Sequence, residues 1–145
     1  FPDGRGLAAA LALGAHGINM GTRFCATVEA PIHPNFKQAM VDADERGTDI
    51  IFRTYRNSAR VARNALSQEV LRLESERRPF EEVAHLVKGV RGREGLESGN
   101  RDHGVWSAGQ VQGLIQDVPT VKVLIDRIVD EAEAIIREKL AGMLA

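Results

Sequence analysis

The sequence predicts an α/β fold that is mostly helical, with one or two short strands. Two observations support this prediction. Residues 3–22 follow the order helix, glycine turn, short apolar stretch and second glycine turn, which is typical of an α/β unit. Over most of the remaining chain, apolar residues recur at spacings of three and four, which is typical of amphipathic helices.

The first helix is predicted from its two ends. Asp3 stands where an N-cap belongs, just before the Ala- and Leu-rich run 7–13, and Gly14 suits the position just after the last turn. This run is apolar almost all round, as expected of a helix packed on a sheet. The stretch 17–20 then has the length and composition of a short buried strand, and Gly21 and Thr22 follow at once.

The middle of the chain is predicted to alternate helices with one strand. His33-Pro34-Asn35 begins a helix with proline in its first turn. Gly47-Thr48-Asp49 ends this helix, and residues 50–52 form a strand-like apolar run. A further helix is predicted from residue 57 or 58 to about residue 76.

The last third is predicted to hold three helices and one loop. A helix starts at Pro79 and runs through Val87, whereas the glycines among charged residues at 90–104 indicate a loop. A short helix covers 108–115, and Pro119 and Thr120 open the final helix. The apolar stripe of that helix is expected to face the core; it consists of Val121, Leu124, Ile125, Ile128, Ala132, Ile135 and Leu140.

Composition narrows the functional classes. The 145-residue chain is 43% hydrophobic and 27% charged with a net charge of −1, so no global field draws it to nucleic acid or to an anionic membrane. No apolar run reaches the roughly 20 residues that span a bilayer. The single Cys25 cannot form an internal disulfide, which favours a reducing cytoplasm.

Two common kinds of reactive site are not indicated. The four histidines (His16, His33, His85 and His103) show no i, i+4 pair and no accompanying cysteine pair, so no metal site is predicted. Cys25 has no histidine or asparagine at a telling spacing, and we therefore expect a small buried or half-buried thiol rather than a nucleophile.

The beginning of the sequence indicates part of a longer protein. Residue 1 is Phe rather than Met, and residues 1–4 have the composition of a turn that leaves a preceding strand. We therefore expect that an N-terminal half is missing, and that the apolar helix and strand of residues 7–20 need neighbours to cover them.

One passage resembles a known family. It consists of Asp3-Gly4-Arg5-Gly6, the Ala- and Leu-rich run 8–15, and Gly17-Ile18-Asn19-Met20-Gly21-Thr22-Arg23-Phe24. This passage is similar to the seventh and eighth β/α units of the nitronate monooxygenase (2-nitropropane dioxygenase) family and of related FMN-dependent enoyl-acyl-carrier-protein reductases. Further matches follow in the family's order: His33-Pro34 with Lys37-Gln38-Ala39, Arg63-Asn64, Ser107-Ala108-Gly109-Gln110, and Gly113-Leu114.

The resemblance implies a fold and its division. The chain would be the C-terminal part of a TIM-type (β/α)8 barrel, a fold of about 250 residues, with a mostly helical insertion. Residues 1–26 would form the end of the barrel, residues 27–106 the helical insertion or lid, and residues 107–145 the helices that close the barrel.

The resemblance also implies a cofactor site. Gly21 and Thr22 would hold the phosphate of FMN, together with a Gly-Gly pair that would lie just before Phe1. This agrees with the phosphate site of barrels at the ends of the last strands, where a glycine lets the backbone come close to the anion. Met20, Ser107 and Gln110 would lie near the flavin or substrate pocket, although a helix cap and a polar surface position explain Ser107 and Gln110 equally well.

The implied activity is oxidation of alkyl nitronates by dioxygen to a carbonyl compound and nitrite, with FMN as cofactor. The catalytic histidine that acts as general base in the family would lie upstream of residue 1. A second reaction of the same fold is the reduction of an enoyl thioester with NAD(P)H.

A competing interpretation belongs to another class. Arg53, Arg56, Arg60 and Arg63 are spaced by three, four and three residues, so on a helix they would form one basic face suited to nucleic acid or another partner. The near-neutral net charge and an aromatic content of 5% favour a solvated face instead.

Overall fold

The computed structural model describes residues 1–144. No helix in this part of the chain is long and apolar enough to cross a membrane. The elements, in order, are α1 (Gly4–Ala12), α2 (Thr22–Cys25), α3 (Pro34–Asp42), β1 (Thr48–Ile51), β2 (Ala59–Ala62), α4 (Ala65–Ser75), α5 (Phe80–Ala84), α6 (Gly89–Ser98), a 3-10 helix η1 (Gln110–Leu114) and α7 (Val121–Ala134), which continues as the helical turns η2 (Ile135–Leu140) and η3 (Ala141–Met143).

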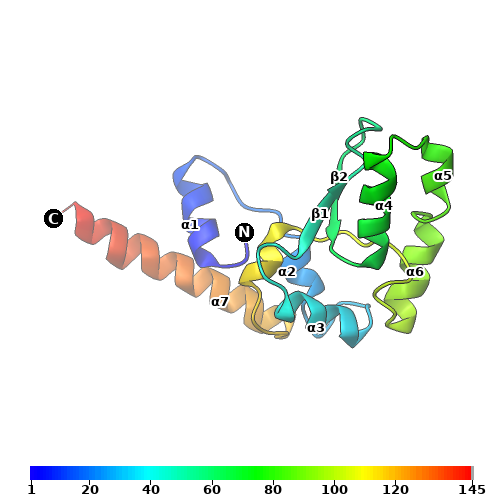
Figure 1. Cartoon of the computed structure of the whole chain (residues 1–145). Coiled ribbons are helices and arrows are strands. Elements are labelled where there is room, and N and C mark those ends of the chain that lie inside the picture. The colour runs from blue at the N-terminus through cyan, green and yellow to red at the C-terminus, as the bar shows by residue number, and fades with distance from the viewer. Residues whose placement is uncertain (145) are drawn as a thin grey trace.

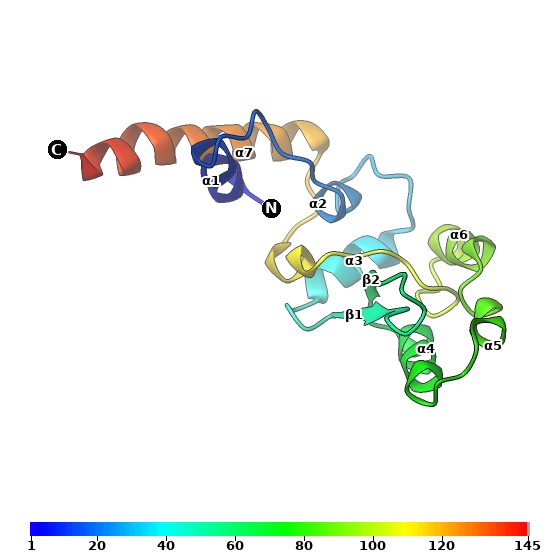
Figure 2. The same ribbon diagram turned by 90° about the horizontal axis from the view of Figure 1, so that it is seen from above.

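The chain folds into an arm and a body (Figures 1 and 2). In the arm, α1 lies against α7, which runs out to the C-terminus. In the body, the antiparallel hairpin β1–β2 is flanked by α4, α5 and α6, and α3 lies near the base of the hairpin. The short helix α2 and η1 lie between these two parts.

The arm forms because α1 and α7 offer each other small and apolar side chains. Gly4 lies so close to α7 that a methyl group at this position would be 2.6 Å from the backbone nitrogen of Ala132. The Gly4 amide donates to the Glu131 carboxylate at 2.7 Å. The predicted start of α1 is confirmed, since Asp3 accepts from the Gly6 amide, and so is its end, where Gly14 adopts a φ of +91°.

Two apolar clusters form the interior of the body. The first joins α3 to the segments around η1; its buried members are Ala26, Phe36, Met40, Ala62, Trp106, Ala108 and Ile115. The second lies between the hairpin and helices α4 and α5; its buried members are Ile51, Val61, Val70 and Val83. The two clusters lie on the two sides of β2, which contributes Ala62 to one and Val61 to the other.

The predicted helix starting at residue 57 or 58 is wrong over its first third. Residues 59–62 form β2, which pairs with β1 from Thr48↔Ala62 to Ile51↔Ala59. Helix α4 begins only at Ala65, where Asn64 and Ser67 form a reciprocal capping box. Pairing with β1 satisfies the backbone of β2 and buries Val61, and these long-range contacts outweigh the local helical spacing.

The loop predicted at 90–104 is also wrong over most of its length, because residues 89–98 form α6. Its glycines are used for close packing rather than for flexibility. A methyl group at Gly104 would lie 2.5 Å from the Gly92 nitrogen, and Gly95 is buried. Glycine lowers helix propensity, but here it allows backbone segments to touch.

The strand predicted at 17–20 is wrong, because these residues form no strand, and Gly17 and Asn19 are exposed. A strand needs a neighbour to satisfy its backbone, and the described residues place none beside this segment.

The C-terminal prediction is confirmed in part. Thr120 caps α7 through the Val123 amide, and Leu124 and Ile128 are buried as expected. Ile125 and Leu140, however, are 45% and 40% exposed, because α1 covers only one face of the helix.

Candidate functional site

The turn at Gly21 is open to solvent. Gly21 is exposed and precedes α2, with φ −93° and ψ −75°, and a methyl group added there would meet no atom within 4 Å. Among the described residues, no group accepts a hydrogen bond from the amides of Gly21, Thr22 or Arg23. The turn therefore combines room for a ligand with three unused N–H donors, which is the arrangement that favours an anion.

Thr22 connects this turn to the segment before η1. The Thr22 Oγ1 accepts a hydrogen bond from the Gly109 amide at 2.9 Å. A hydroxyl that accepts one bond keeps its own hydrogen for donation. Thr22 can therefore hold the Gly109 segment and donate to a ligand in the turn at the same time.

Arg23 fixes α2 in place. Its side chain is 4% exposed and reaches Asp117, donating to the carboxylate at 2.7 Å and to the backbone carbonyl at 3.0 Å. Burial lowers the pKa of Arg23, and the neighbouring Asp117 carboxylate opposes that shift, so the side chain stays charged. Because this guanidinium is committed to Asp117, an anion in the turn would be held by N–H and O–H donors rather than by Arg23.

The predicted pocket residues lie at the edges of this turn. Met20 is half-buried and directly precedes Gly21. Ser107 and Gln110 are exposed and lie two and one residues from Gly109, so the Thr22–Gly109 bond brings their segment to the turn. Ser107 also forms an antiparallel bridge with Val61, which ties the segment to the hairpin.

The other candidate reactive side chains, Cys25 and His33, lie in surroundings that indicate a structural role. Burial raises the pKa of the Cys25 thiol, which disfavours a thiolate nucleophile. The His33 ring accepts from the Asn35 amide at 3.2 Å and so caps α3, which confirms that a helix begins at His33-Pro34-Asn35. Residues 1–144 contain no cluster of three or more His, Cys, Asp or Glu side chains that could hold a metal ion.

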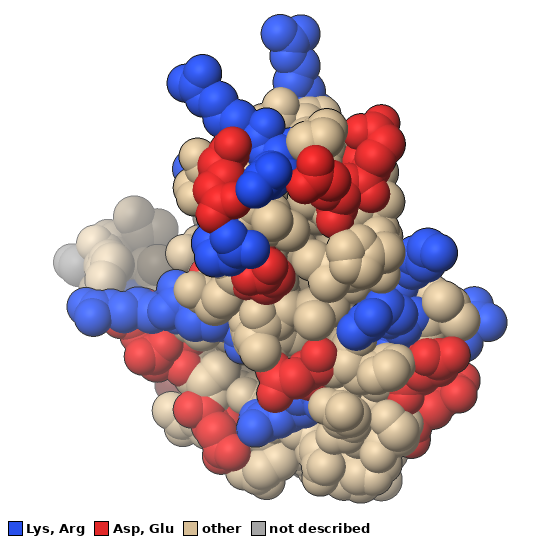
Figure 3. Space-filling view, turned by 45° about the vertical axis from the view of Figure 1, so that its right-hand side comes forward, with Lys and Arg blue, Asp and Glu red and all other residues tan. Residues whose placement is uncertain are grey.

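The predicted arginine face does not form. Arg53 and Arg56 lie in the hairpin loop, Arg60 lies on β2, and Arg63 follows it. Arg60 donates to Thr48 Oγ1 at 2.8 Å, and Arg63 is paired with Asp49 at 3.1 Å. On the face seen in Figure 3, basic and acidic side chains are intermixed. These four arginines therefore belong to a hairpin and not to one helix, so they do not share a basic helical face. The nucleic-acid interpretation, which was based on that face, has no support in the structure.

Sequence reasoning assigned no structural role to three residues that shape the candidate site, namely Arg23, Gly109 and Asp117. A signal existed for Arg23, because an arginine between Thr22 and the apolar Phe24-Cys25-Ala26 is placed to be buried and then needs an acceptor. No local signal could identify Asp117 as that acceptor, since 94 residues separate the two.

Comparison with known proteins shows the family. The model of the nitronate monooxygenase family matches residues 1–131, and the chain therefore belongs to this family of flavin-dependent oxidoreductases.

Among its relatives, a probable nitronate monooxygenase of Bacillus subtilis is 28% identical over 89% of this chain and 37% of its own length. The (3aS,4S,5R,7aS)-5-hydroxy-7a-methyl-1-oxo-octahydro-1H-indene-4-carboxyl-CoA dehydrogenase of Rhodococcus jostii is 33% identical over 99% of this chain and 50% of its own length. The solved structure of FabK from Thermotoga maritima is 35% identical, with a TM-score of 0.90 over 99% of this chain and 45% of that protein. The chain thus spans between about a third and a half of the length of these two relatives.

Proposed function

We propose that this chain supplies the FMN phosphate site of a nitronate monooxygenase, an enzyme that oxidises alkyl nitronates with dioxygen to a carbonyl compound and nitrite. The observation that supports it best is the open turn at Gly21, where the space beside the glycine is unfilled and the amides of residues 21–23 have no acceptor among the described residues.

The residues present fit a phosphate. A phosphate group offers oxygens to several donors at once, and the amides of residues 21–23 with the Thr22 hydroxyl supply such donors. Gly21 has no Cβ, so the anion can approach the backbone. The N-terminus of α2 also favours an anion, although a helix of four residues has only a small dipole.

Bound FMN would supply the electron chemistry, and the residues of this chain would bind the cofactor and orient it. Gly21 and Thr22 anchor the cofactor by its phosphate. Met20, Ser107 and Gln110 line the neighbouring pocket, with Ser107 and Gln110 kept at the turn by the Thr22–Gly109 bond. The general-base histidine of the family, which would remove the proton next to the nitro group of a neutral nitroalkane, is not one of the residues of this chain in this proposal.

The proposal assigns parts of the chain to a barrel and its cover. Residues 1–26 and 107–145 belong to the barrel, and residues 27–106 form the insertion above the site. The packing of α1 on α7, apart from the hairpin and its helices, supports this division (Figures 1 and 2).

The site is tested by completing the barrel. The part of T. maritima FabK that this chain does not match is fused before residue 1, and bound flavin is measured from the visible spectrum. We expect the chimera to carry flavin, and the 145-residue chain to bind FMN weakly or not at all, because the resemblance places half of the phosphate cradle before residue 1.

A matched pair of variants locates the phosphate. Gly21→Val places a side chain at the proposed phosphate site, where an added Cβ would meet no atom within 4 Å, and Gly17→Val makes the same change at another glycine whose added Cβ would meet none. We expect Gly21→Val to abolish flavin binding by the chimera and Gly17→Val to leave it intact, while the flavin-free forms of the two variants melt at the same temperature. Full flavin content in Gly21→Val would exclude this turn as the phosphate site.

A second candidate function is supported by the relatives. The dehydrogenase named for a carboxyl-CoA substrate is 33% identical over 99% of the chain, against 28% over 89% for the B. subtilis nitronate monooxygenase. The intact enzyme would then be an FMN-dependent reductase or other oxidoreductase of a thioester, with NAD(P)H as its partner. Oxygen uptake with propyl-2-nitronate, compared with NADH oxidation in the presence of an enoyl-CoA, separates the two activities; both need the Gly21 turn.

A further inference from the structure

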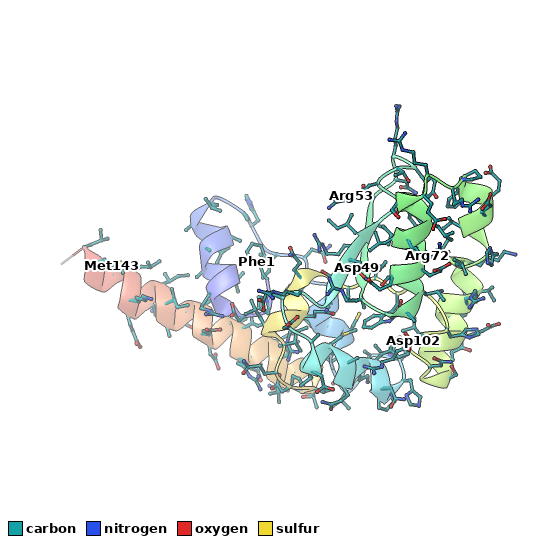
Figure 4. All side chains as sticks on the ribbon, in the orientation of Figure 1. Phe1, Asp49, Arg53, Arg72, Asp102 and Met143 are labelled. Carbon is teal, nitrogen blue, oxygen red and sulfur yellow. The ribbon has the colours of Figure 1, made fainter. Side chains whose placement is uncertain are left out.

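The loop between β1 and β2, residues 52–57, forms the hairpin tip, which lies beside the turn that follows α4 (Figure 1). The loop closes on itself, because the Asn57 amide donates to the Phe52 carbonyl at 3.1 Å and the Arg56 amide donates to the Arg53 carbonyl at 3.2 Å. Arg53 is labelled at this end of the hairpin in Figure 4. These two hydrogen bonds give the loop a defined backbone.

Three non-glycine residues of the described chain have a positive φ, and all three lie in the hairpin tip or in the turn beside it. Phe52 and Arg56 have φ of +66° and +56°, and Arg77, just after α4, has φ of +57°. A residue with a Cβ adopts this conformation rarely and at a cost, and such residues gather at functional sites. Phe52 packs against the second apolar cluster, whereas the two arginines are exposed, so packing does not account for them.

Hydrogen bonds hold the hairpin tip and the turn after α4 together. The Glu74 carboxylate, 6% exposed, accepts from the amides of Phe52 and Thr54 at 2.7 and 3.1 Å and from the Thr54 hydroxyl at 2.9 Å. The Tyr55 hydroxyl donates to the Arg78 carbonyl at 2.8 Å. The space between the two segments is therefore a built part of the fold.

This space is a pocket of about 480 Å³ that opens to solvent, and its lining residues are Thr54, Tyr55, Arg77, Arg78, Pro79 and Phe80. The ring centroids of Tyr55 and Phe80 are 5.4 Å apart, and Phe80 is 45% exposed. An exposed ring offers a face or an edge to a planar base. Because Arg77 is exposed as well, a ligand in the pocket can reach both side chains from solvent.

The hairpin tip carries an excess of positive charge. Three arginines have no carboxylate within ion-pair distance among residues 1–144, namely Arg53, Arg56 and Arg77. Nearby Glu76 and Glu82 are both paired with Arg78, which leaves Glu81 as the carboxylate of α5 without an ion pair. At the top of the molecule in Figure 3, basic side chains project beyond the acidic ones. This charge favours an anionic ligand.

We propose that the pocket at the hairpin tip binds a phosphorylated nucleoside, whose base stacks on Phe80 and whose phosphate pairs with Arg77. Such a ligand joins a planar ring to a phosphate dianion, so it uses the aromatic wall and the unpaired arginine together. Coenzyme A carries this group as an adenosine with a 3′-phosphate, and NADPH carries it as an adenosine with a 2′-phosphate. The pocket shares no residue with the Gly21 turn, and binding there does not depend on the proposed function.

The test uses the one tyrosine of the chain, since Tyr55 lines the pocket and its ring resonances report on a bound base. Adenosine 3′,5′-bisphosphate, adenosine 2′,5′-bisphosphate, adenosine and inorganic phosphate are each titrated to about 10 mM at constant ionic strength. We expect saturable shifts with at least one bisphosphate, and affinity at least about tenfold lower for adenosine and for inorganic phosphate. The isomer that binds more tightly identifies coenzyme A or NADPH as the source of the group.

Variants separate binding from folding. Arg77→Gly relieves the left-handed backbone, so it should be at least as stable as the unsubstituted protein and yet bind the preferred bisphosphate about tenfold more weakly. A purely structural role would not give these opposite changes. Arg93→Gln removes an exposed arginine from α6 and should leave binding unchanged. Phe80→Leu keeps an apolar side chain but removes the ring, and we expect it to weaken the bisphosphate about fivefold or more.

Three outcomes overturn the proposal. Tyr55 resonances that are insensitive to both bisphosphates would mean that no nucleotide enters the pocket. Equal affinity for a bisphosphate and for adenosine would mean that the arginines do not bind the phosphate. Unchanged affinity in both Arg77→Gly and Phe80→Leu would place any nucleotide binding elsewhere on the chain.

Discussion

Thr22 and Gly109 are 87 residues apart in sequence, and the hydroxyl oxygen of one accepts a hydrogen bond from the amide of the other at 2.9 Å. This bond joins the glycine turn before α2 to the segment that carries Ser107 and Gln110. It brings together the two parts of the chain that form the proposed cofactor site. The stability of the fold and the proposed cofactor site therefore depend on the same hydroxyl.

Replacing Thr22 tests both roles together. Thr22→Val keeps the shape but removes the hydroxyl, so the Gly109 amide loses its acceptor, and we expect unfolding to become easier by about 1–3 kcal/mol. In the flavin-binding chimera, the same variant should weaken FMN about tenfold, since a charge-assisted bond to phosphate is also lost. Urea unfolding and flavin titration measure the two effects. Thr22→Ser, which keeps the oxygen, should restore both; no difference between Val and Ser would count against the bond.

The buried Arg23 should be more important for stability than its exposed counterparts. Arg23→Met leaves the Asp117 carboxylate without its buried partner, and we expect a loss of about 2–4 kcal/mol, since Asp117 keeps a contact with Arg127 at 2.7 Å. Arg5→Met breaks the exposed pair with Asp3 and should cost less than about 1 kcal/mol. Denaturant unfolding measures the unfolding free energy of both variants. Equal losses would show that burial of the Arg23 side chain contributes nothing to stability.

Asp49 should make stability depend on acid pH. Burial alone would raise its pKa, but hydrogen bonds from Ser67, Gln68 and Arg63 outweigh burial and hold the pKa of Asp49 below its ordinary value. A carboxyl whose folded pKa is lowered contributes stability above its unfolded pKa of about 4, and the contribution is lost as the pH falls through the folded pKa.

The loss of unfolding free energy caused by Asp49→Asn should therefore depend on pH. Near neutral pH we expect the variant to be less stable by about 1–3 kcal/mol. The gap between the two proteins should narrow as the pH falls below about 4, because the carboxyl of the unsubstituted protein is then protonated as well. Urea unfolding across this range measures it, and a gap that stays constant with pH would contradict the assignment.

One substitution should stabilise the protein. Arg77 follows the C-cap of α4 with φ +57°, and its amide donates to the Glu74 carbonyl, which is the helix end that favours glycine. Its side chain is exposed, so Arg77→Gly relieves the left-handed backbone without losing packing, and we expect a gain of about 1 kcal/mol. Arg53→Gly, where φ is not positive, should give no gain. Thermal unfolding distinguishes the two.

The residue types near a helix end were sufficient to predict that end where a side-chain cap or a glycine defines it. Asp3, Gly14 and Thr120 were predicted from residue type alone, and each occupies its expected cap because a cap depends on backbone groups only two or three residues away. The glycine turn at residue 21 belongs to the same class. Its residues could be proposed from sequence, although their ligand stays a proposal.

Long-range contacts decided the rest. Residues 59–62 lie in a stretch that was predicted to be helical, but they form a strand, because β1 offers a hydrogen-bonded edge and a place to bury Val61. The glycine-rich stretch around Gly92 looks like a loop but is a helix, because Val105 and Gly104 pack closely against it. In both places the local preference is about 1 kcal/mol or less per residue, and tertiary contacts exceed it.

By itself, the sequence determined both ends of α1, the start of α7, the glycine turn and the order of motifs that marks the family, because these depend on neighbours along the chain. Only the tertiary structure decided that Thr22 meets Gly109, that Arg23 is buried against Asp117, and that Trp106 and Gln112 share one cavity. Each of those contacts joins segments whose approach is set by how the whole chain packs, and no spacing in the sequence records it.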